Sequence, residues 1–271
     1  METMAERMEA IRRRAGLTAA QVSTGALSAE EQAEVYNSRR GDLQGYDCKK
    51  CRNKGYIFEI RDGYEYTLEC ECMEVRRAIW RLENSGLMDV IEMYRMDNFT
   101  TDTNYHKNMK AMAEGFLNRD EGWYFVGGQV GAGKTHICTA VCSELLKQRK
   151  SVRYIIWPEE VTKLKGIKMN DEEYAAAMNE LKRFDVLYID DFFKKQEGIM
   201  PTPADVDIAF ELLNSLYLQK EKRVIISSER TVQEITEQID QGLGSRIFQK
   251  CGAYQLSIAK DTGKNYRLYN T

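Results

Sequence analysis

The stretch that decides the fold runs from residue 128 to residue 135 and reads Gly128-Gln129-Val130-Gly131-Ala132-Gly133-Lys134-Thr135. It fits the phosphate-binding pattern of a glycine, four residues of any type, and then Gly-Lys-Ser/Thr. In such a loop, backbone N–H groups surround the phosphates at the start of a helix whose dipole favours anions. The pattern predicts a nucleoside triphosphate site where Lys134 contacts the β- and γ-phosphates and the Thr135 hydroxyl holds Mg²⁺.

The residues on either side of the loop support this interpretation. Trp123 to Val126 is a short aromatic and β-branched run, as expected of a buried strand that leads into the loop. After the loop, Ile137, Ala140, Val141 and Leu145 recur at helical spacing. We therefore prefer a nucleotide site to the alternative of a glycine-rich turn with a chance Lys-Thr pair.

Composition limits the classes of protein that remain. With 271 residues, 43% hydrophobic and 30% charged, the chain can form one α/β domain and a small accessory domain. The N-terminus lacks the apolar core of a signal peptide, and no stretch approaches the roughly 18 apolar residues of a membrane span. We expect a cytoplasmic protein without membrane contact, whose seven cysteines form no disulfides. The net charge of −3 gives no global attraction to DNA, so nucleic-acid contacts must be local or helped by a partner.

Apolar runs alternate with helical segments over residues 105–271. This alternation predicts an α/β fold with a parallel sheet that is covered by helices on both faces. The five predicted strands are Trp123–Val126, Val152–Trp157, Val186–Ile189, Val224–Ser227 and Tyr254–Ile258.

Two carboxylates follow the third of these runs. Asp190 and Asp191 stand where a buried strand emerges at its carboxyl end, beside the expected phosphate loop. We predict that Asp190 holds Mg²⁺ through water and that Asp191 orients or deprotonates the attacking water. If no phosphate loop were present, we would interpret Asp190 and Asp191 as part of an ordinary acidic loop after a core strand.

Two later segments complete the predicted catalytic set. Arg223 to Glu229 is an apolar strand with a polar end, where ATPases of this kind place the residue that senses the γ-phosphate. Gly244-Ser245-Arg246-Ile247 offers an arginine in what we interpret as a short polar turn. Such an arginine can reach the nucleotide of a neighbouring subunit and stabilise transition-state charge. The alternative for Arg246 is a surface arginine in a salt bridge.

Four cysteines cluster before the ATPase part. Cys48, Cys51, Cys70 and Cys72 form a Cys-x2-Cys pair, an eighteen-residue spacer and a Cys-x-Cys pair. The spacer carries two strand-like runs around Asp62-Gly63, a hairpin signal that would bring the pairs together. Four thiolates suit tetrahedral Zn²⁺; an iron–sulfur cluster and unligated thiols remain the alternatives. Cys138 and Cys142, by contrast, are predicted to be core residues of the helix after the phosphate loop.

The chain thus divides into four parts. Residues 1–42 form a charged helical arm, in which residues 2–14 could be one amphipathic helix and Ser28 to Glu31 a capping box that opens a second helix. Residues 43–86 form the zinc module, which ends in a helix from Glu74 to Gly86. Residues 87–104 are the linker, and residues 105–271 the ATPase domain.

Together these motifs resemble the DnaC/DnaI group of AAA+ helicase loaders, in the versions of Gram-positive bacteria and their phages. The resemblance rests on both cysteine pairs, the loop from Gly127 to His136, Tyr188-Ile189-Asp190-Asp191, Ile226-Ser227-Ser228-Glu229 and Gly244 to Ile247. It implies an AAA+ P-loop ATPase with a five-stranded parallel sheet in the order 5-1-4-3-2. It further implies that residues 128–136 bind ATP, that Arg246 is an arginine finger, and that Ser228 or Glu229 is the sensor.

The resemblance also implies partners. The family member would bind the hexameric replicative DNA helicase through its zinc-bearing part, assist its placement on single-stranded DNA, and self-associate in a ring or helical assembly. Only 25 residues follow Arg246, too few for the C-terminal helical lid of clamp loaders. Two departures are Glu229, where many relatives have Asn, and Leu216, where the family pattern often has Arg.

Other functions remain open at this point. An IstB-type transposition ATPase has the same fold, and a helicase-binding adaptor could use the nucleotide site only as a switch. Lys163, Lys165 and Lys168 follow the second strand, where initiator-type relatives contact DNA, although a solvated helix face explains them equally well.

Overall fold

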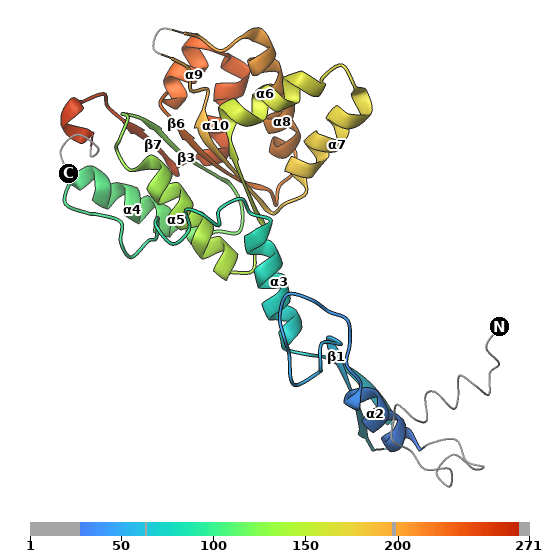
Figure 1. Ribbon diagram of the computed structural model, residues 1–271. Coiled ribbons are helices and arrows are strands. Elements are labelled where there is room, and N and C mark those ends of the chain that lie inside the picture. Colours follow the sequence, from blue (N-terminus) through green and yellow to red (C-terminus); the bar gives the residue numbers. More distant parts are fainter. Residues whose placement is uncertain (1–27, 63, 197–198, 266–271) are drawn as a thin grey trace. The chain divides into compact units, whose positions relative to one another are not determined.

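The structure is a computed structural model that describes residues 28–62, 64–196 and 199–265 (Figure 1). These residues form two compact units, one that ends at Ile79 and one that begins at Trp80. The amphipathic helix predicted for residues 2–14 lies outside the described residues.

The smaller unit is a helix, a hairpin and the start of a second helix. Helix α2 (Ala29–Ser38) begins with the predicted capping box, in which Ser28 and Glu31 bond to each other's backbone N–H. Strands β1 (Tyr56–Arg61) and β2 (Tyr64–Glu69) pair antiparallel, with Arg61 opposite Tyr64, as the Asp62-Gly63 turn predicts. Helix α3 (Cys72–Glu83) follows directly and continues into the larger unit.

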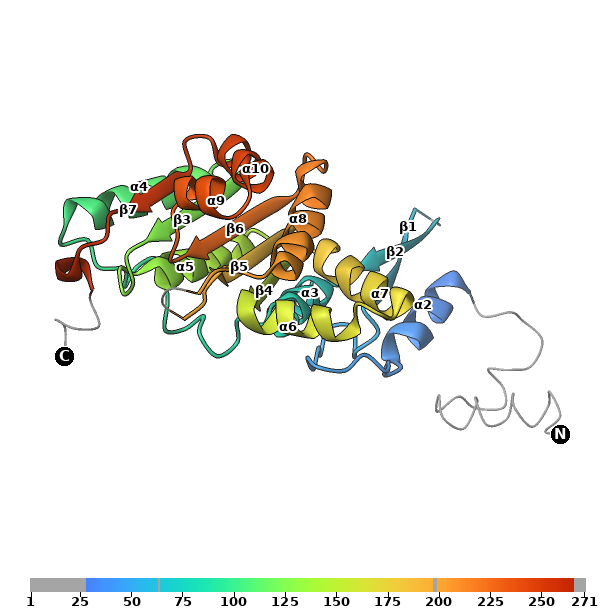
Figure 2. The ribbon, with the colours of Figure 1, turned by 90° about the horizontal axis from the view of Figure 1, so that it is seen from above.

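The larger unit is a sheet between two layers of helices (Figure 2). Its parallel strands lie in the order β4-β5-β6-β3-β7, which is the predicted order 5-1-4-3-2 counted along the ATPase part. The α/β fold class is therefore confirmed. The elements in chain order are α4 (Asn104–Leu117), β3 (Trp123–Gly128), α5 (Lys134–Lys147), β4 (Val152–Ile156), α6 (Trp157–Ile167), α7 (Asp171–Lys182), β5 (Val186–Phe192), α8 (Pro203–Tyr217), β6 (Arg223–Ser228), α9 (Val232–Gln238), α10 (Gln241–Cys251), β7 (Gln255–Ile258) and the 3₁₀ turn η2 (Thr262–Lys264).

Alternating side chains of the central strands enter two separate hydrophobic clusters. Trp123 and Phe125 of β3 pack with α6 to α10 on one face, whereas Tyr124 and Val126 pack with α4 and α5 on the other. Because both faces are covered, strands β3 and β6 are buried along their whole length. Cys138 and Cys142 are fully buried in the second cluster, as predicted for core residues.

The segment expected to be a linker, residues 87–104, belongs to the larger unit. Leu87 and Phe99 are buried in its second hydrophobic cluster. Just before it, the Ser85 carbonyl accepts a 2.6 Å hydrogen bond from the Tyr154 N–H of β4, the edge strand of the sheet. This contact satisfies a donor that an uncovered edge strand would leave open.

The described helices are all too short or too polar to cross a membrane. After β7, the described chain adds only the η2 turn, so no helical lid follows the sheet within residues 28–265.

Candidate nucleotide and metal sites

The phosphate loop joins the end of β3 to the start of α5 in a conformation that only glycine allows. Gly128, Gly131 and Gly133 have φ of 108°, 73° and 81°. A Cβ on Gly128 would also lie 2.0 Å from the Ile258 carbonyl oxygen of β7. Gly133 is the N-cap of α5, so the open N–H groups of this helix face the loop. The loop therefore has the backbone donors that an anion requires.

Lys134 lies inside the loop. Its side chain is 8% exposed, and its Nζ donates to the carbonyl oxygens of Gly128 and Gln129 at 3.1 and 2.6 Å. Burial lowers the pKa of Lys134, and nearby carboxylates, Glu229 and Asp191 foremost, oppose this effect. A bound phosphate could replace the two carbonyl oxygens as the hydrogen-bond partner of Lys134 Nζ, and its negative charge would compensate the charge of the lysine.

Asp190 is the hub of a hydrogen-bond network at the end of β5. Its carboxylate is nearly buried and accepts from the Thr135 hydroxyl at 3.3 Å and from the Tyr154 hydroxyl at 3.2 Å. The Ser227 hydroxyl of β6 donates to the same carboxylate. The pairing of Asp190 with the Thr135 hydroxyl is an all-oxygen donor set, which suits Mg²⁺.

Asp191 stands at a strained turn directly after Asp190. Its φ is +54° and that of Phe193 is +56°, and the register between β5 and β6 shifts between Ile189 and Phe192. Non-glycine residues in this region cost of order 1–3 kcal/mol and cluster at functional sites. The turn directs Asp191 into the cavity beside the phosphate loop, where Lys194 and Glu229 are also lining residues.

The Ser228 side chain lies outside the lining of the nucleotide cavity, and its predicted role as the sensor stays a prediction. The Ser228 hydroxyl is buried, donates to the Phe192 carbonyl at 2.6 Å and accepts from the Arg230 N–H at 3.0 Å. These bonds fix the turn after β6 and keep Ser228 out of the cavity lining. Because successive side chains of a strand point to opposite faces, Ser227 contacts Asp190 instead. Glu229, the other predicted sensor, does line the cavity.

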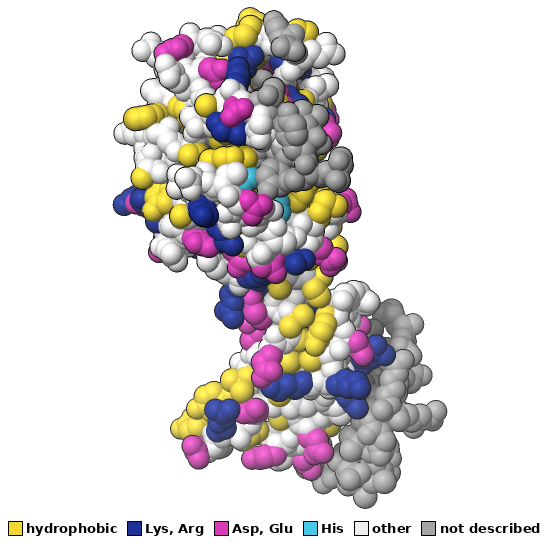
Figure 3. Space-filling model, turned by 90° about the vertical axis from the view of Figure 1, so that its left-hand side faces the viewer, with side chains coloured by type: hydrophobic (Ala, Val, Ile, Leu, Met, Phe, Trp, Pro, Cys, Tyr) yellow, Lys and Arg dark blue, Asp and Glu magenta, His cyan; other side chains and the backbone are white. Residues whose placement is uncertain are grey.

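Aromatic side chains form the opposite wall of the cavity. Tyr94 and Phe99 lie 5.1 Å from the His136 ring, centroid to centroid, and Phe99 also contacts the His106 ring edge-on at 5.6 Å. Burial lowers the pKa of both histidines. In Figure 3 histidine reaches the surface of the larger unit beside hydrophobic side chains, and acidic and basic groups are mixed around it. Flat, uncharged rings of this kind suit a nucleobase.

Arg246 belongs to helix α10, which corrects the predicted polar turn. Gly244 makes the helix possible here, since a Cβ at that position would lie 2.1 Å from the Thr236 hydroxyl of α9. The Arg246 guanidinium donates to Asn214 Oδ1 at 3.0 Å and lies 4.7 Å from the Phe210 ring centroid. Arg246 is thus placed by α8 and is absent from the lining of its own nucleotide cavity.

Two of the three lysines considered for DNA contact make ion pairs. Lys165 lies 2.7 Å from Asp205, whose side chain is fully buried, and Lys195 binds the other carboxylate oxygen at 2.9 Å. Lys163 pairs with Glu160 on the surface of α6. Lys165 therefore has a structural role, and the DNA contact stays a prediction for Lys163 and Lys168.

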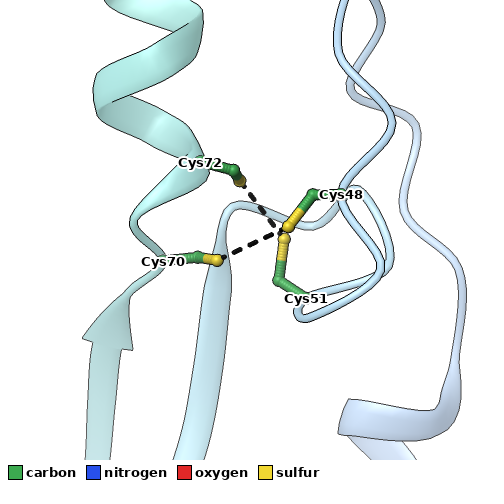
Figure 4. A group of neighbouring side chains, drawn as sticks. All are labelled: Cys48, Cys51, Cys70 and Cys72. Atoms are coloured by element: carbon green, nitrogen blue, oxygen red, sulfur yellow. Dashed lines mark hydrogen bonds between the residues drawn. The ribbon is translucent and has the colours of Figure 1, made fainter.

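The four predicted metal ligands come together in the smaller unit (Figure 4). All four Sγ atoms lie within 4.8 Å of one another, with Cys48 and Cys70 at 3.8 Å and Cys51 and Cys72 at 3.4 Å. Zn–S bonds of about 2.3 Å in a tetrahedron imply sulfur–sulfur edges of about 3.8 Å. The Gly55 N–H donates to Cys51 Sγ at 3.3 Å, as backbone amides do toward thiolates. The donor set fits Zn²⁺.

Comparison with known proteins identifies the family of the larger unit. Residues 92–252 match the bacterial DnaA ATPase domain. The chain belongs to this family. It is also 30% identical to the phage-like element PBSX protein XkdC of Bacillus subtilis strain 168, over 80% of this chain and 84% of that protein.

Solved structures of AAA+ proteins share the fold. AMPPCP-bound DnaA from Aquifex aeolicus matches with a TM-score of 0.51 and 23% identity, over 65% of this chain and 53% of that chain. The DnaC helicase loader matches with a TM-score of 0.52 and 13% identity, over 63% of this chain and 98% of that one. The chain therefore spans about half the length of the DnaA structure and nearly the whole DnaC structure. The predicted AAA+ ATPase fold is confirmed, and it is shared with the DnaC helicase loader; the family shown for residues 92–252 is the bacterial DnaA ATPase domain.

Sequence reasoning missed the aromatic wall of the nucleotide cavity and three residues that contact the two aspartates. Tyr154 and Ser227 contact Asp190 from the neighbouring strands β4 and β6, and Lys194 contacts Asp191. Ser227 could have been found from strand alternation opposite Asp190. Neither Tyr154 nor Lys194 belongs to a motif, and only the fold brings them to the site.

Proposed function

We propose that this protein is an ATP-hydrolysing helicase loader, which binds a replicative DNA helicase and assists its placement on single-stranded DNA. The observation that carries the ATPase part is the convergence of Lys134, Thr135, Asp190 and Asp191 on one cavity edge. The helicase part rests on the fold shared with the DnaC helicase loader and on the metal-binding unit that precedes the ATPase.

Each residue of the site has a distinct task in hydrolysis. Lys134 binds the β- and γ-phosphates, and the backbone N–H groups of residues 128–136 cradle them. Asp190 and Thr135 would hold Mg²⁺, and this ion would supply positive charge to offset the charge that develops on the phosphate oxygens. Asp191 orients the attacking water and accepts its proton. Tyr94, Phe99 and His136 contact the nucleobase through their ring faces and edges.

Two variants test the ATPase. Lys134→Ala should weaken ATP binding by roughly a hundredfold, since it removes a buried charge from the phosphates. Asp191→Asn should bind ATP normally and hydrolyse it slowly, because asparagine has the shape of aspartate but cannot accept the proton of the attacking water. Lys147→Ala, an exposed lysine at the other end of α5, is the matched control for charge. Equal loss of binding in Lys134→Ala and Asp191→Asn would instead make Asp191 a metal ligand.

The partner is tested with the intact protein as bait in an extract of its native host. Recovery of a hexameric replicative helicase supports the loader. Recovery of a transposase favours the IstB-type function instead. A helicase-bound protein whose ATP turnover is absent with and without single-stranded DNA would be an adaptor.

We further propose that Arg246 completes the ATP site of a neighbouring subunit in a ring or helical assembly. Its half-buried position on α10, outside the lining of its own cavity, supports a role between subunits. Turnover per chain should then rise with protein concentration, and Arg246→Ala should lose this rise, an effect of roughly 10³ in rate, while it still binds ATP.

A mixing experiment tests the shared site. Arg246→Ala retains an intact phosphate loop and Lys134→Ala retains the arginine, so a mixture of the two should recover part of the activity. If the variants associate and the mixture stays inactive, Arg246 is a structural residue that α8 holds in place.

A further inference from the structure

Lys194 is the cation that faces the catalytic carboxylate in the nucleotide cavity. Its Nζ lies 3.0 Å from Asp191 Oδ2 and 3.3 Å from Glu229 Oε1. The Lys194 N–H also donates to the Asp191 carbonyl at 2.9 Å, which closes the turn over residues 191–194. All three side chains line the cavity that Lys134 and Thr135 enter from the phosphate loop.

The side chains of the residues before and after Lys194 are both held by contacts, which restrains the backbone of the turn. Phe193 is buried against Phe192, with ring centroids 4.1 Å apart. Lys195 is bound to the buried carboxylate of Asp205. Lys194 itself is about 40% exposed, and its side chain carries a positive charge into the cavity. A fixed backbone with one movable cation is suited to respond to a ligand.

The negative charge of Glu229 calls for a cation in the cavity if a γ-phosphate is to bind there. Without a counter-charge, a carboxylate at the sensor position would repel a γ-phosphate, as would Asp191. Lys194 offsets both carboxylates, and its pKa is raised: burial lowers it, but the bonds to Asp191 and Glu229 outweigh burial. A triphosphate offers Lys194 a stronger anionic partner in the same cavity than either carboxylate does.

We propose that Lys194 binds the γ-phosphate and, together with Glu229, forms the sensor that distinguishes ATP from ADP. In the structure Lys194 forms an ion pair with Asp191. With ATP it turns to the γ-phosphate, which leaves Asp191 free to accept a hydrogen bond from water. This inference rests on the proposed ATPase function and adds to it a residue outside the known motifs.

The test compares two nucleotides that differ in the γ-phosphate. Dissociation constants for AMPPCP and ADP, both with Mg²⁺, are measured by calorimetry for the wild type, Lys194→Met and Glu229→Gln. Lys194→Met should weaken AMPPCP binding by roughly tenfold and change ADP binding by less than about twofold, because a charge-assisted hydrogen bond to one phosphate is lost. Glu229→Gln should strengthen AMPPCP binding, since Lys194 then has one competing carboxylate fewer. Lys260→Met, which breaks an exposed ion pair with Glu234, is the matched control.

The outcomes separate this inference from the proposed function. If the wild type binds neither nucleotide, both are wrong. If the wild type binds both and Lys194→Met keeps the wild-type ratio of AMPPCP to ADP affinity, only the role of Lys194 is wrong. If thermal melting shows that Lys194→Met is misfolded, Glu229→Gln decides, because it retains the lysine. Failure of Glu229→Gln to shift the ratio toward AMPPCP would then overturn the inference.

Discussion

The smaller and the larger unit of this chain are each stabilised by a different kind of core. The buried core of the smaller unit consists of four cysteines, with Ile57 and Met73 packed against them, and helix α2 has no buried residue. The larger unit buries two apolar clusters on opposite faces of one sheet. A unit this small buries too little apolar surface to fold alone, so we expect metal binding at the four cysteines to supply the missing free energy. The nucleotide site, by contrast, is built on a sheet whose two faces are both packed against buried apolar clusters.

Metal removal should produce the largest difference between the units. A strong chelator, or Cys51→Ser, should release one zinc per chain and unfold residues 28–79, while the melting temperature of the larger unit stays unchanged. Metal analysis and limited proteolysis with mass spectrometry measure the two effects. Cys251→Ser, which alters a buried cysteine outside the cluster, should retain the zinc. A metal-free protein whose smaller unit still resists protease would contradict the expectation that this unit needs metal to fold.

Truncation of the apolar core should do the reverse. Leu213 of α8 is fully buried in the first cluster, so Leu213→Ala should lower the free energy of unfolding of the larger unit by about 4 kcal/mol. Zinc content should stay at one per chain. Leu218→Ala at the exposed end of the same helix should have almost no effect in the same denaturant titration. Zinc loss in Leu213→Ala would mean that the two units fold together.

A smaller effect tests whether charge also stabilises the larger unit. Asp205→Asn should cost about 3 kcal/mol at pH 7, because it leaves Lys165 and Lys195 without their buried carboxylate. Asp207→Asn, an exposed neighbour on α8, is the control.

The pH dependence of this effect follows from the pKa of Asp205. Burial would raise this pKa, but the bonds from Lys165, Lys195 and Thr202 outweigh burial and lower it. A lowered pKa stabilises the fold above the unfolded value of about 3.9, and this stabilisation is lost as the pH falls toward the folded pKa. The difference between wild type and Asp205→Asn should therefore be constant from pH 7 to 5 and shrink below about pH 4. A difference that grows on acidification would contradict the ion-pair explanation.

The features that the sequence predicts correctly are those whose geometry is set by residues close together in the chain. The phosphate loop, the Asp62-Gly63 hairpin and the Ser28 capping box are short patterns whose geometry is set by neighbouring residues, and each was predicted at the right position. Arg246 was assigned to a turn because Gly244 and Ser245 disfavour a helix interior. Helix α10 forms there because its glycine packs against α9, a contact that no local pattern contains.

The sequence by itself determined the phosphate-loop motif, the paired cysteines and the α/β alternation, because residue type and short spacing dictate each of these. Only the tertiary structure decided which side chains surround Asp190 and Asp191. Lys194 reaches Asp191 within the turn where β5 shifts its register, whereas Tyr154 and Ser227 reach Asp190 because neighbouring strands end side by side. Such contacts join residues that lie up to 37 positions apart, so they exist only once the sheet has formed.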